Sequence, residues 1–448
     1  MDTLNISPID GRYNQKTKAL CNYFSEYGLI KYRINIEIKY LVFLLGKINN
    51  HSLTNNEIND IVNIIYKFNY KESKIVKNHE KNCNHDVKAV EYYIRDKLKI
   101  LNLSRLNSFI HFGLTSQDIN NMAITLSIKE FINNSYIKNL QEIIDFINDI
   151  SDSWKHIVII AKTHGQPANP TTLGKEFKVF SYRLEKQLDI LKNIKYYGKF
   201  GGAVGNINAH YFAYQDIDWD KEFDFFVDNI GLIREKYTTQ IDNYENLAVV
   251  FDCLRRINTI LIDFNRDIWG YISFNYFNLK FSENEVGSST MPQKINPINF
   301  ENSEGNLMIC NTLLDFMSNK LPISRFQRDL TDSTILRNIG TIFGHIMISF
   351  DNLLSGLRKL TPNEEIIKNE LENNYSVLSE ALQTILRKNN IENGYEIIKS
   401  HFRNNKTVTR DVFKSIILEL DLNEDEKEKL LNLTHDKYIG NALFNFAI

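Results

Sequence analysis

The sequence has 448 residues, of which 43% are hydrophobic and 24% are charged, and its formal net charge is −2. A chain of this length suggests about three domains with a substantial core, and the composition is ordinary for a soluble globular protein. A charge so close to zero gives no electrostatic reason to expect a nucleic acid or a membrane surface as partner. Any anionic ligand must therefore be bound by a local cluster of basic residues.

The start of the sequence and its cysteines favour a reducing, cytoplasmic location. The first residues lack the apolar core of a signal peptide, and no uncharged apolar run reaches the roughly 18 residues of a membrane span. The four cysteines are far apart and form no CxxC pair or Cys/His metal spacing: Cys21, Cys83, Cys253 and Cys310.

In chain order, the first predicted element is a helical N-terminal domain, residues 1–110, and the second is a long-helix bundle, residues 111–364. No proline occurs between Pro170 and Pro292, so this interval permits long helices. Apolar residues recur there and nearby at three- and four-residue steps. The helices predicted from this spacing cover residues 124–147, 177–191, 247–268 and, with a weaker pattern because of Gly340 and Gly344, 336–360.

After the bundle the pattern changes to short, charged helices, such as Glu424 to Leu433, which we assign to a C-terminal domain, residues 365–448. Alternating strand patterns are nearly absent, which predicts an all-α fold. The long helices are too apolar for ordinary surface helices, and apolar residues on more than one face indicate that the bundle packs against other subunits.

Four polar segments interrupt the helical pattern, each at the predicted end of a helix. Each combines small residues with hydrogen-bonding side chains, which suits close approach to a polar ligand. The segments are NCNHDVKAVEYY with Asn84, His85, Asp86 and Lys88; HFGLTSQDINN with His111, Thr115, Ser116 and Asp118; KTHGQPANPTTLGKE with His164; and GSSTMPQKINP, residues 287–297.

Taken singly, these segments also have ordinary structural explanations. Thr115 or Asp118 could simply cap a helix, and Gly165 could simply turn the chain. A lone histidine such as His85 is more often a packed or surface residue. Taken alone, the hydroxyl run at residues 288–290 is better explained as an ordinary mobile surface loop.

A fifth segment, SRFQRDLTDSTILRN, gathers arginines and hydroxyl groups. If its latter part is helical, Ser333 and Arg337 fall on one face, four residues apart. Arginine forks and hydroxyls arranged in this way could bind phosphate or carboxylate. The alternative is a solvated helix face that Asp329 and Asp332 neutralise.

Considered together, the segments resemble one family. GSSTMPQKINP is similar to the signature of the fumarase/aspartase superfamily, whose members eliminate fumarate from a substituted succinate. SPIDGRY, NHDVKAVEYY, THGQPANPTTLGKE, GGAVGNINAH, YTTQI, INPINFENSEGN and SRFQRDLTDSTILRN resemble the adenylosuccinate lyases of the bacterial purine pathway, nearly end to end. Gln293 departs from that pattern and resembles the argininosuccinate lyases, which are the nearest alternative. A non-catalytic helical nucleotide-binding relative is a further alternative.

The resemblance implies a three-domain, all-α, fumarase/aspartase-like fold whose long helices form the core of a homotetramer. It implies cleavage of adenylosuccinate to AMP and fumarate, and of the related succinylocarboxamide ribotide (SAICAR) to AICAR and fumarate. Both reactions are C–N bond β-eliminations without a metal or an organic cofactor. Each active site would take segments from three chains.

The resemblance also implies a role for individual residues. Ser288 is the expected base, with Ser289 as the open alternative, and His164 is the expected acid, with His85 as its competitor. The residues expected to bind the nucleotide phosphate are Arg12, Tyr13, Arg328, Ser333 and Arg337. Those expected to bind the succinyl carboxylates are Thr115, Ser116, Gln240, Lys294 and Asn296, while Asn84, His85 and Asp86 would bind and orient the substrate.

Overall fold

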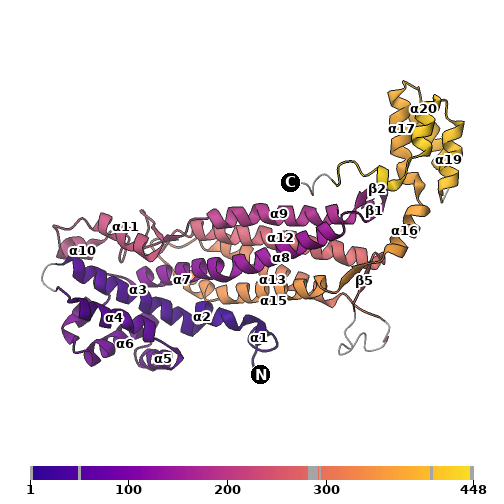
Figure 1. Ribbon diagram of the computed structural model, residues 1–448. Helices are drawn as coiled ribbons and strands as arrows, with labels where there is room; N and C mark the ends of the chain where they lie inside the picture. Colours follow the sequence, from indigo (N-terminus) through magenta and orange to yellow (C-terminus); the bar gives the residue numbers. More distant parts are fainter. Residues whose placement is uncertain (1–3, 49–51, 281–290, 292–293, 404–406, 444–448) are drawn as a thin grey trace. The chain divides into compact units, whose positions relative to one another are not determined.

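The structure is a computed structural model that describes residues 4–48, 52–280, 291, 294–403 and 407–443 (Figure 1). The predicted base Ser288, its alternative Ser289 and the divergent Gln293 lie outside the described residues. The chain divides into two compact units. The first comprises Met1–Leu140, Gln187–Thr259 and Gly305–Asp351, and the second comprises Gln141–Lys186, Ile260–Glu304 and Asn352–Ile448.

The first unit contains mostly helices. They are α1 (Asn14–Thr17), α2 (Cys21–Phe24), α3 (Glu26–Lys47), α4 (Asn55–Lys67), α5 (Tyr70–Cys83), α6 (Asp86–Ile100), α7 (Ser116–Phe131), α10 (Asn208–Ala213), α11 (Trp219–Ile230) and α14 (Thr331–Leu336). Two short strands, β3 (Tyr197–Gly198) and β4 (Ile233–Arg234), pair in parallel.

The second unit holds the hairpin strands β1 (Val158–Thr163) and β2 (Gln166–Thr172), and the antiparallel pair β5 (Phe277–Leu279) and β6 (Leu360–Pro362). Its own helices are α16 (Glu364–Glu372), α17 (Ser379–Lys388), α18 (Gly394–Phe402), α19 (Arg410–Glu419) and α20 (Glu424–Leu431). The helices with residues in both units are α8 (Ile137–Ser153), α9 (Leu173–Asn193), α12 (Glu245–Ser273), α13 (Ile298–Lys320) and α15 (Ile339–Leu357).

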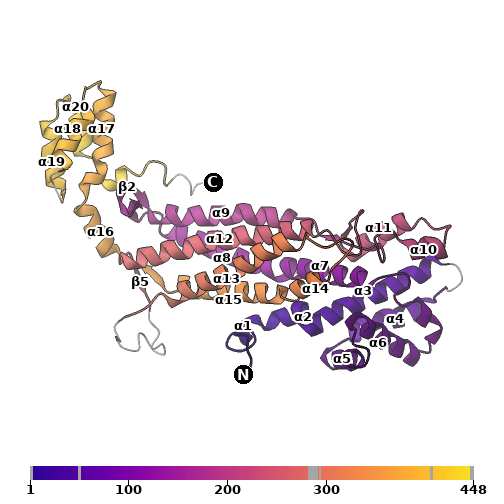
Figure 2. The same cartoon turned by 180° about the vertical axis from the view of Figure 1, so that it is seen from behind.

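In the first unit, α3 is the central element of the N-terminal part. Ser25 caps its start by accepting a hydrogen bond from the Gly28 N–H at 3.1 Å, so the helix begins at a defined residue. Figures 1 and 2 show α4, α5 and α6 beside α3, and α7 also packs against α3. The largely apolar face of α3 is thereby buried, but it also carries the buried polar residues Arg33 and Glu37.

The apolar spacing predicted the long helices well. Residues 177–191 lie within α9 and residues 247–268 lie within α12. The stretch 124–147 is helical throughout, but a π-helical turn, Ile132–Tyr136, separates α7 from α8. The helix predicted at 336–360 is α15, and the short strand β6 begins at its predicted end.

Gly340 and Gly344 of α15 allow the N-terminal segment to approach this helix closely. A Cβ atom added at Gly344 would lie 2.9 Å from Cγ2 of Ile9, and one at Gly340 would lie 3.0 Å from Cβ of Phe24. Packing against the N-terminal segment therefore requires a residue without a side chain at both positions. This requirement explains why two glycines interrupt the apolar pattern of the helix.

The β1–β2 hairpin is an element that the sequence pattern did not predict. Val158 pairs with Thr172 and Thr163 pairs with Gln166, so His164 and Gly165 form the two-residue turn. Both turn residues have positive φ, 53° and 72°, as in a type I′ turn. All described strands are short and the chain is mainly helical, so the all-α prediction is confirmed.

The C-terminal helices of the second unit have a hydrophobic cluster of their own, which includes Leu378, Leu382, Phe413, Ile417 and Leu430. Within it α17 packs against α18 and α20, as Figure 2 shows. The division of the chain into three consecutive domains remains a prediction. Among the described helices, none is both long enough and apolar enough to cross a membrane.

Candidate active site

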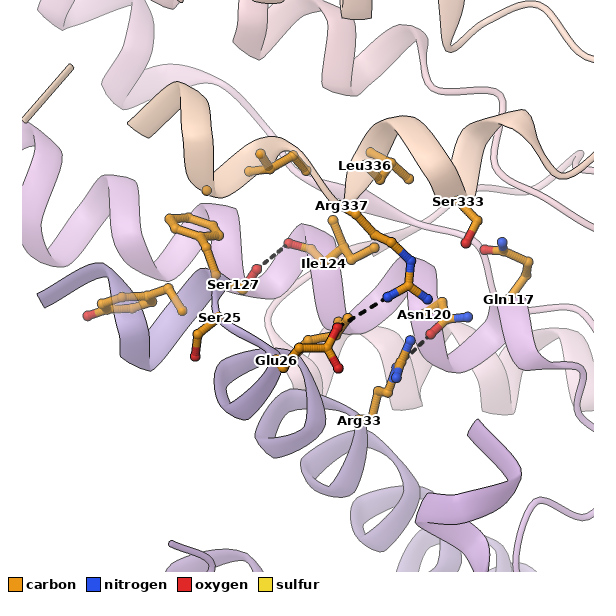
Figure 3. A pocket seen from close by; sticks show the side chains of 15 residues that line it. Ser25, Glu26, Arg33, Gln117, Asn120, Ile124, Ser127, Ser333, Leu336 and Arg337 are labelled. Carbon is orange, nitrogen blue, oxygen red and sulfur yellow. Dashed lines mark hydrogen bonds and ion pairs between the residues drawn. The ribbon is translucent and has the colours of Figure 1, made fainter. Parts of the chain in front are cut away.

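A cavity of about 170 Å³ lies in the first unit where α3, α7 and α14 converge (Figure 3). Pockets that enclose a whole drug-sized ligand measure roughly 300–1,000 Å³, so this cavity suits one polar group of a larger ligand. The polar side chains that line it are Tyr23, Ser25, Glu26, Arg33, Gln117, Asn120, Ser127, Ser333 and Arg337. In Figure 3, Gln117 from α7 and Ser333 from α14 point toward one another.

Two guanidinium groups meet one carboxylate beside this cavity. Arg33 Nη2 lies 2.6 Å from Asp86 Oδ2, and Arg337 Nη2 lies 3.1 Å from the same oxygen. Arg33 is only 4% exposed, whereas Arg337 is 47% exposed and also contacts Glu26 at 3.3 Å. Burial raises the pKa of Asp86, but the charge and hydrogen bond of Arg33, with the Val87 N–H and Arg337, outweigh it and leave the pKa below its usual value.

Of the predicted phosphate ligands, Ser333 and Arg337 lie together on this cavity. Ser333 belongs to α14, and Arg337 directly follows the helix with helical angles, φ −63° and ψ −15°. The predicted helical segment is therefore confirmed. The neighbouring Asp332 is buried and accepts hydrogen bonds from Gln117 Nε2 at 3.2 Å and from the Tyr244 hydroxyl at 2.8 Å.

Arg33, Gln117 and Asn120 also line the cavity, although no motif of the sequence singled them out. Arg33 Nε donates to Asn120 Oδ1 at 2.8 Å, and both residues lie on helices whose apolar pattern dominates. The sequence does contain one indication of Arg33. It lies among the apolar positions of KYRINIEIKY, and an arginine is costly to bury without a partner, so a buried partner is expected.

Arg12 and Tyr13 lie just before and at the N-cap of α1, and the Arg12 guanidinium is 5.9 Å from the centre of the Tyr13 ring. A second hollow adjoins this N-terminal segment and is lined by Asp10, Asn14 and, as in the first cavity, Arg337. Arg337 thus borders both hollows.

The turn between α5 and α6 carries Asn84 and His85. Asn84 ends α5 in a left-handed conformation, with φ 51°. His85 caps α6, because its Nδ1 accepts a hydrogen bond from the Lys88 N–H at 3.1 Å. The ring is therefore held with Nε2 as its hydrogen-bond donor, and the side chain is exposed.

A second polar group in the first unit surrounds the start of α7. Thr115 is the N-cap residue and Ser116 the first helical residue, and the Thr115 N–H donates to Asp118 Oδ2 at 2.8 Å. The capping role foreseen for Thr115 and Asp118 is confirmed.

Gln240 and Arg328 contact each other, because Arg328 Nη1 donates to Gln240 Oε1 at 2.9 Å. Gln240 Nε2 in turn donates to the Ala203 carbonyl at 3.1 Å. The glycine-rich segment around Ala203 is bound to Asp118 through the Gly201 and Gly202 N–H groups. The structure therefore joins predicted ligands from three separate parts of the sequence.

In the second unit, His164 is exposed in the turn between β1 and β2. Lys294 is exposed and Asn296 half-buried, just before α13. Within the residues described for this unit, no hydrogen bond or ion pair joins His164 to either of them.

The hairpin that carries His164 is fixed by Glu370 of α16. Lys162 of β1 forms an ion pair with Glu370, and the Tyr276 hydroxyl donates to the same carboxylate. Because Tyr276 immediately precedes β5, this one carboxylate connects the hairpin, α16 and the β5–β6 pair.

Two family models match consecutive parts of the chain. Residues 11–312 match the family described as lyase, and residues 324–439 match that described as adenylosuccinate lyase C-terminal. The adenylosuccinate lyase of Dictyostelium discoideum is 47% identical and covers 97% of this chain and 96% of its own. Those of Buchnera aphidicola from Acyrthosiphon pisum (45%; 98% and 96%) and Escherichia coli strain K12 (42%; 98% and 97%) are similarly related.

A solved structure confirms the fold at greater evolutionary distance. The 3-carboxy-cis,cis-muconate lactonizing enzyme from Pseudomonas putida superposes with a TM-score of 0.76 at 16% identity, over 96% of this chain and 95% of that one. The predicted fumarase/aspartase-like architecture is therefore confirmed.

Proposed function

The chain belongs to the adenylosuccinate lyase family, and we propose that it cleaves adenylosuccinate to AMP and fumarate, and SAICAR to AICAR and fumarate. The observation that carries this proposal is the 42–47% identity to adenylosuccinate lyases over nearly the whole chain. The protein is thus a carbon–nitrogen lyase. The match of residues 324–439 to the C-terminal family of adenylosuccinate lyases favours this activity over argininosuccinate cleavage.

The reaction requires a base, an acid and stabilisation of negative charge. The base removes a proton from Cβ of the succinyl group, the electron pair forms the new C=C bond, and the C–N bond breaks. The departing nitrogen takes a proton from the acid and leaves as an amine. We assign the base to Ser288 and the acid to His164. The exposed position of His164 in a tight turn supports this, and an imidazole suits proton transfer near neutral pH.

The substrate brings one phosphate and two carboxylates to a nearly neutral protein, so local cations must bind them. For the phosphate we propose Ser333 and Arg337 at the cavity of the first unit, with Arg12, Tyr13 and Arg328. An entering phosphate would take the place of Glu26 beside the half-exposed Arg337, while the buried Arg33 keeps Asp86 in position. A charge-assisted hydrogen bond of this kind contributes about 1.5–3 kcal/mol.

For the succinyl carboxylates we propose Thr115, Ser116 and Gln240, together with Lys294 and Asn296. The first turn of α7 supports this assignment, because N–H groups at the start of a long helix lack intrahelical partners and attract anions. Asn84, His85 and Asp86 would orient the remainder of the substrate.

We further propose that the protein acts as a homotetramer in the cytoplasm. Exposed apolar side chains on the part of α13 within the first unit, Met308, Ile309 and Phe316, support self-association. A shared site would also explain why the proposed ligands lie at the ends of different helices. All four cysteines are free thiols, which suits a reducing compartment.

The test is the ultraviolet spectrum of the purified protein with adenylosuccinate, beside Ser288→Ala and the matched control Ser289→Ala. We expect wild type and Ser289→Ala to produce the AMP spectrum, and Ser288→Ala to be slower by about 100-fold or more. Loss in Ser289→Ala alone would move the base to that residue. No conversion by the wild-type tetramer, with turnover of argininosuccinate instead, would overturn the proposed substrate.

A further inference from the structure

An ion pair in the first unit lies entirely out of contact with solvent. Lys199 Nζ is 2.7 Å from Asp118 Oδ1, and both side chains are 0% exposed. Lys199 Nζ also donates to the Gly202 carbonyl at 2.6 Å. Two charges are costly to bury before they pair, and an apolar pair of similar size is often as stable. The stability of the fold alone therefore does not explain why a charged pair, Asp118 and Lys199, occupies this buried position.

The carboxylate of Asp118 collects backbone donors from two separate segments. Oδ2 accepts from the Thr115 N–H at 2.8 Å, and Oδ1 accepts from Gly201 at 2.9 Å and Gly202 at 3.1 Å. The backbone N–H of Lys199 itself donates to Asn121 Oδ1 at 2.7 Å. One buried carboxylate thus fixes the distance between the start of α7 and the glycine-rich segment 201–205.

The opposite side of that segment contacts Thr238–Gln240. A Cβ atom on Gly205, whose φ is +83°, would lie 2.1 Å from the Thr238 carbonyl oxygen, so only glycine permits this approach. Gln240 Nε2 donates to the Ala203 carbonyl, and Arg328 donates to Gln240. A displacement of the glycine-rich segment would therefore move Gln240 relative to Thr115.

We propose that Asp118 and Lys199 are positioning residues that set the spacing between Thr115–Ser116 and Gln240, and so determine the affinity for the dicarboxylate part of the substrate. This inference rests on the proposed function, which assigns those three residues to the succinyl carboxylates. The pairing has an electrostatic reason as well. Asp118 without Lys199 would place an unneutralised negative charge next to a site for a dianion.

The experiment compares Asp118→Asn with Asp224→Asn in the full-length enzyme. Asp224 is the control, because it too pairs with a basic residue, Arg234, at 2.7 Å, although its side chain is 39% exposed. Among the described residues, no hydrogen bond of Asp224 reaches the proposed ligands. For each variant, KM for adenylosuccinate is measured with the inhibition constants of fumarate and of AMP. In Asp118→Asn we expect KM and the fumarate constant to rise about tenfold or more, and the AMP constant to change less than about twofold.

A purely structural role would change the amount of active enzyme, or raise both inhibition constants together, and either result in Asp118→Asn would overturn the proposal. So would an unchanged fumarate constant. If Asp118→Asn does not fold, the double variant Asp118→Asn/Lys199→Met removes both charges and is expected to fold. It should show the same selective loss of fumarate affinity.

The outcomes also separate the two proposals. If the wild-type protein cleaves adenylosuccinate but the variants show no selective loss, only the role of the Asp118–Lys199 pair fails. If the wild-type protein cleaves no adenylosuccinate, the proposed function fails, and this inference fails with it.

Discussion

At the residue scale, Asp242 is a buried carboxyl group, only 6% exposed. Burial raises its pKa to about 6, although hydrogen bonds from Asn121 and from the Asn243 and Tyr244 N–H groups oppose the shift. A raised pKa in the folded protein means that the fold favours the protonated form. This contribution to stability is complete below the unfolded pKa of about 3.9 and is lost as pH rises to about 6.

Asp242→Asn should therefore become stabilising relative to wild type as pH increases. We expect little difference near pH 4 and an advantage of up to about 3 kcal/mol above pH 7. Unfolding midpoints of both proteins across this range test the prediction. A difference that does not vary with pH would show that Asp242 is not the titrating group.

Arg337 offers a second test at this scale, because its guanidinium group contacts Glu26, whose place the phosphate would take, while Asp86 stays paired with Arg33. Arg337→Lys keeps the charge but loses the planar pair of donors. We expect KM for adenylosuccinate to rise about 10- to 100-fold. The control is Arg325→Lys, an exposed arginine of the same segment that pairs with Asp329. Equal effects of the two substitutions would argue against a phosphate site at Arg337.

At the scale of the elements, the hairpin β1–β2 depends on Glu370 for its attachment to α16. Glu370→Gln keeps a hydrogen-bond acceptor for Tyr276 but removes the ion pair with Lys162. Because His164 lies in the turn of this hairpin, we expect kcat to fall about tenfold with KM nearly unchanged. The control is Glu365→Gln on the exposed first turn of the same helix. A change in KM alone would indicate that the hairpin binds substrate without taking part in proton transfer.

The helices could be predicted from the sequence because burial of an apolar face imposes a regular spacing, as in residues 177–191 and 247–268. The hairpin could not, because Pro167 and Pro170 argue against a strand. The structure accommodates them because both strands of a two-stranded pair are edge strands. At the cavity, the sequence pattern could place Ser333 and Arg337 side by side, because they are four positions apart in a segment that stays helical in its backbone angles through Arg337. The pairing of Asp118 with Lys199 joins residues 81 positions apart, and no local pattern records such a contact.

At the scale of the whole molecule, the exposed apolar residues of α13 allow the proposed tetramer to be tested. Phe316 is 50% exposed, and Phe316→Glu would place a charge on an apolar contact surface. We expect sedimentation velocity to show smaller species, with a parallel loss of activity if subunits share active sites. The control is Asn319→Glu, an exposed position of the same helix. A fully active wild-type monomer would contradict both the assembly and the sharing.

The carboxylate of Asp118 also constrains how this sequence can change over time. Because Lys199, Thr115 and two glycine N–H groups all rely on it, substitutions at these positions should have strongly non-additive effects. A change tolerated in one genetic background would be harmful in another, depending on which partner is already altered. Descendants of this protein should therefore retain all of these residues or replace several of them together. Residues on the exposed helix faces should instead be substituted one at a time.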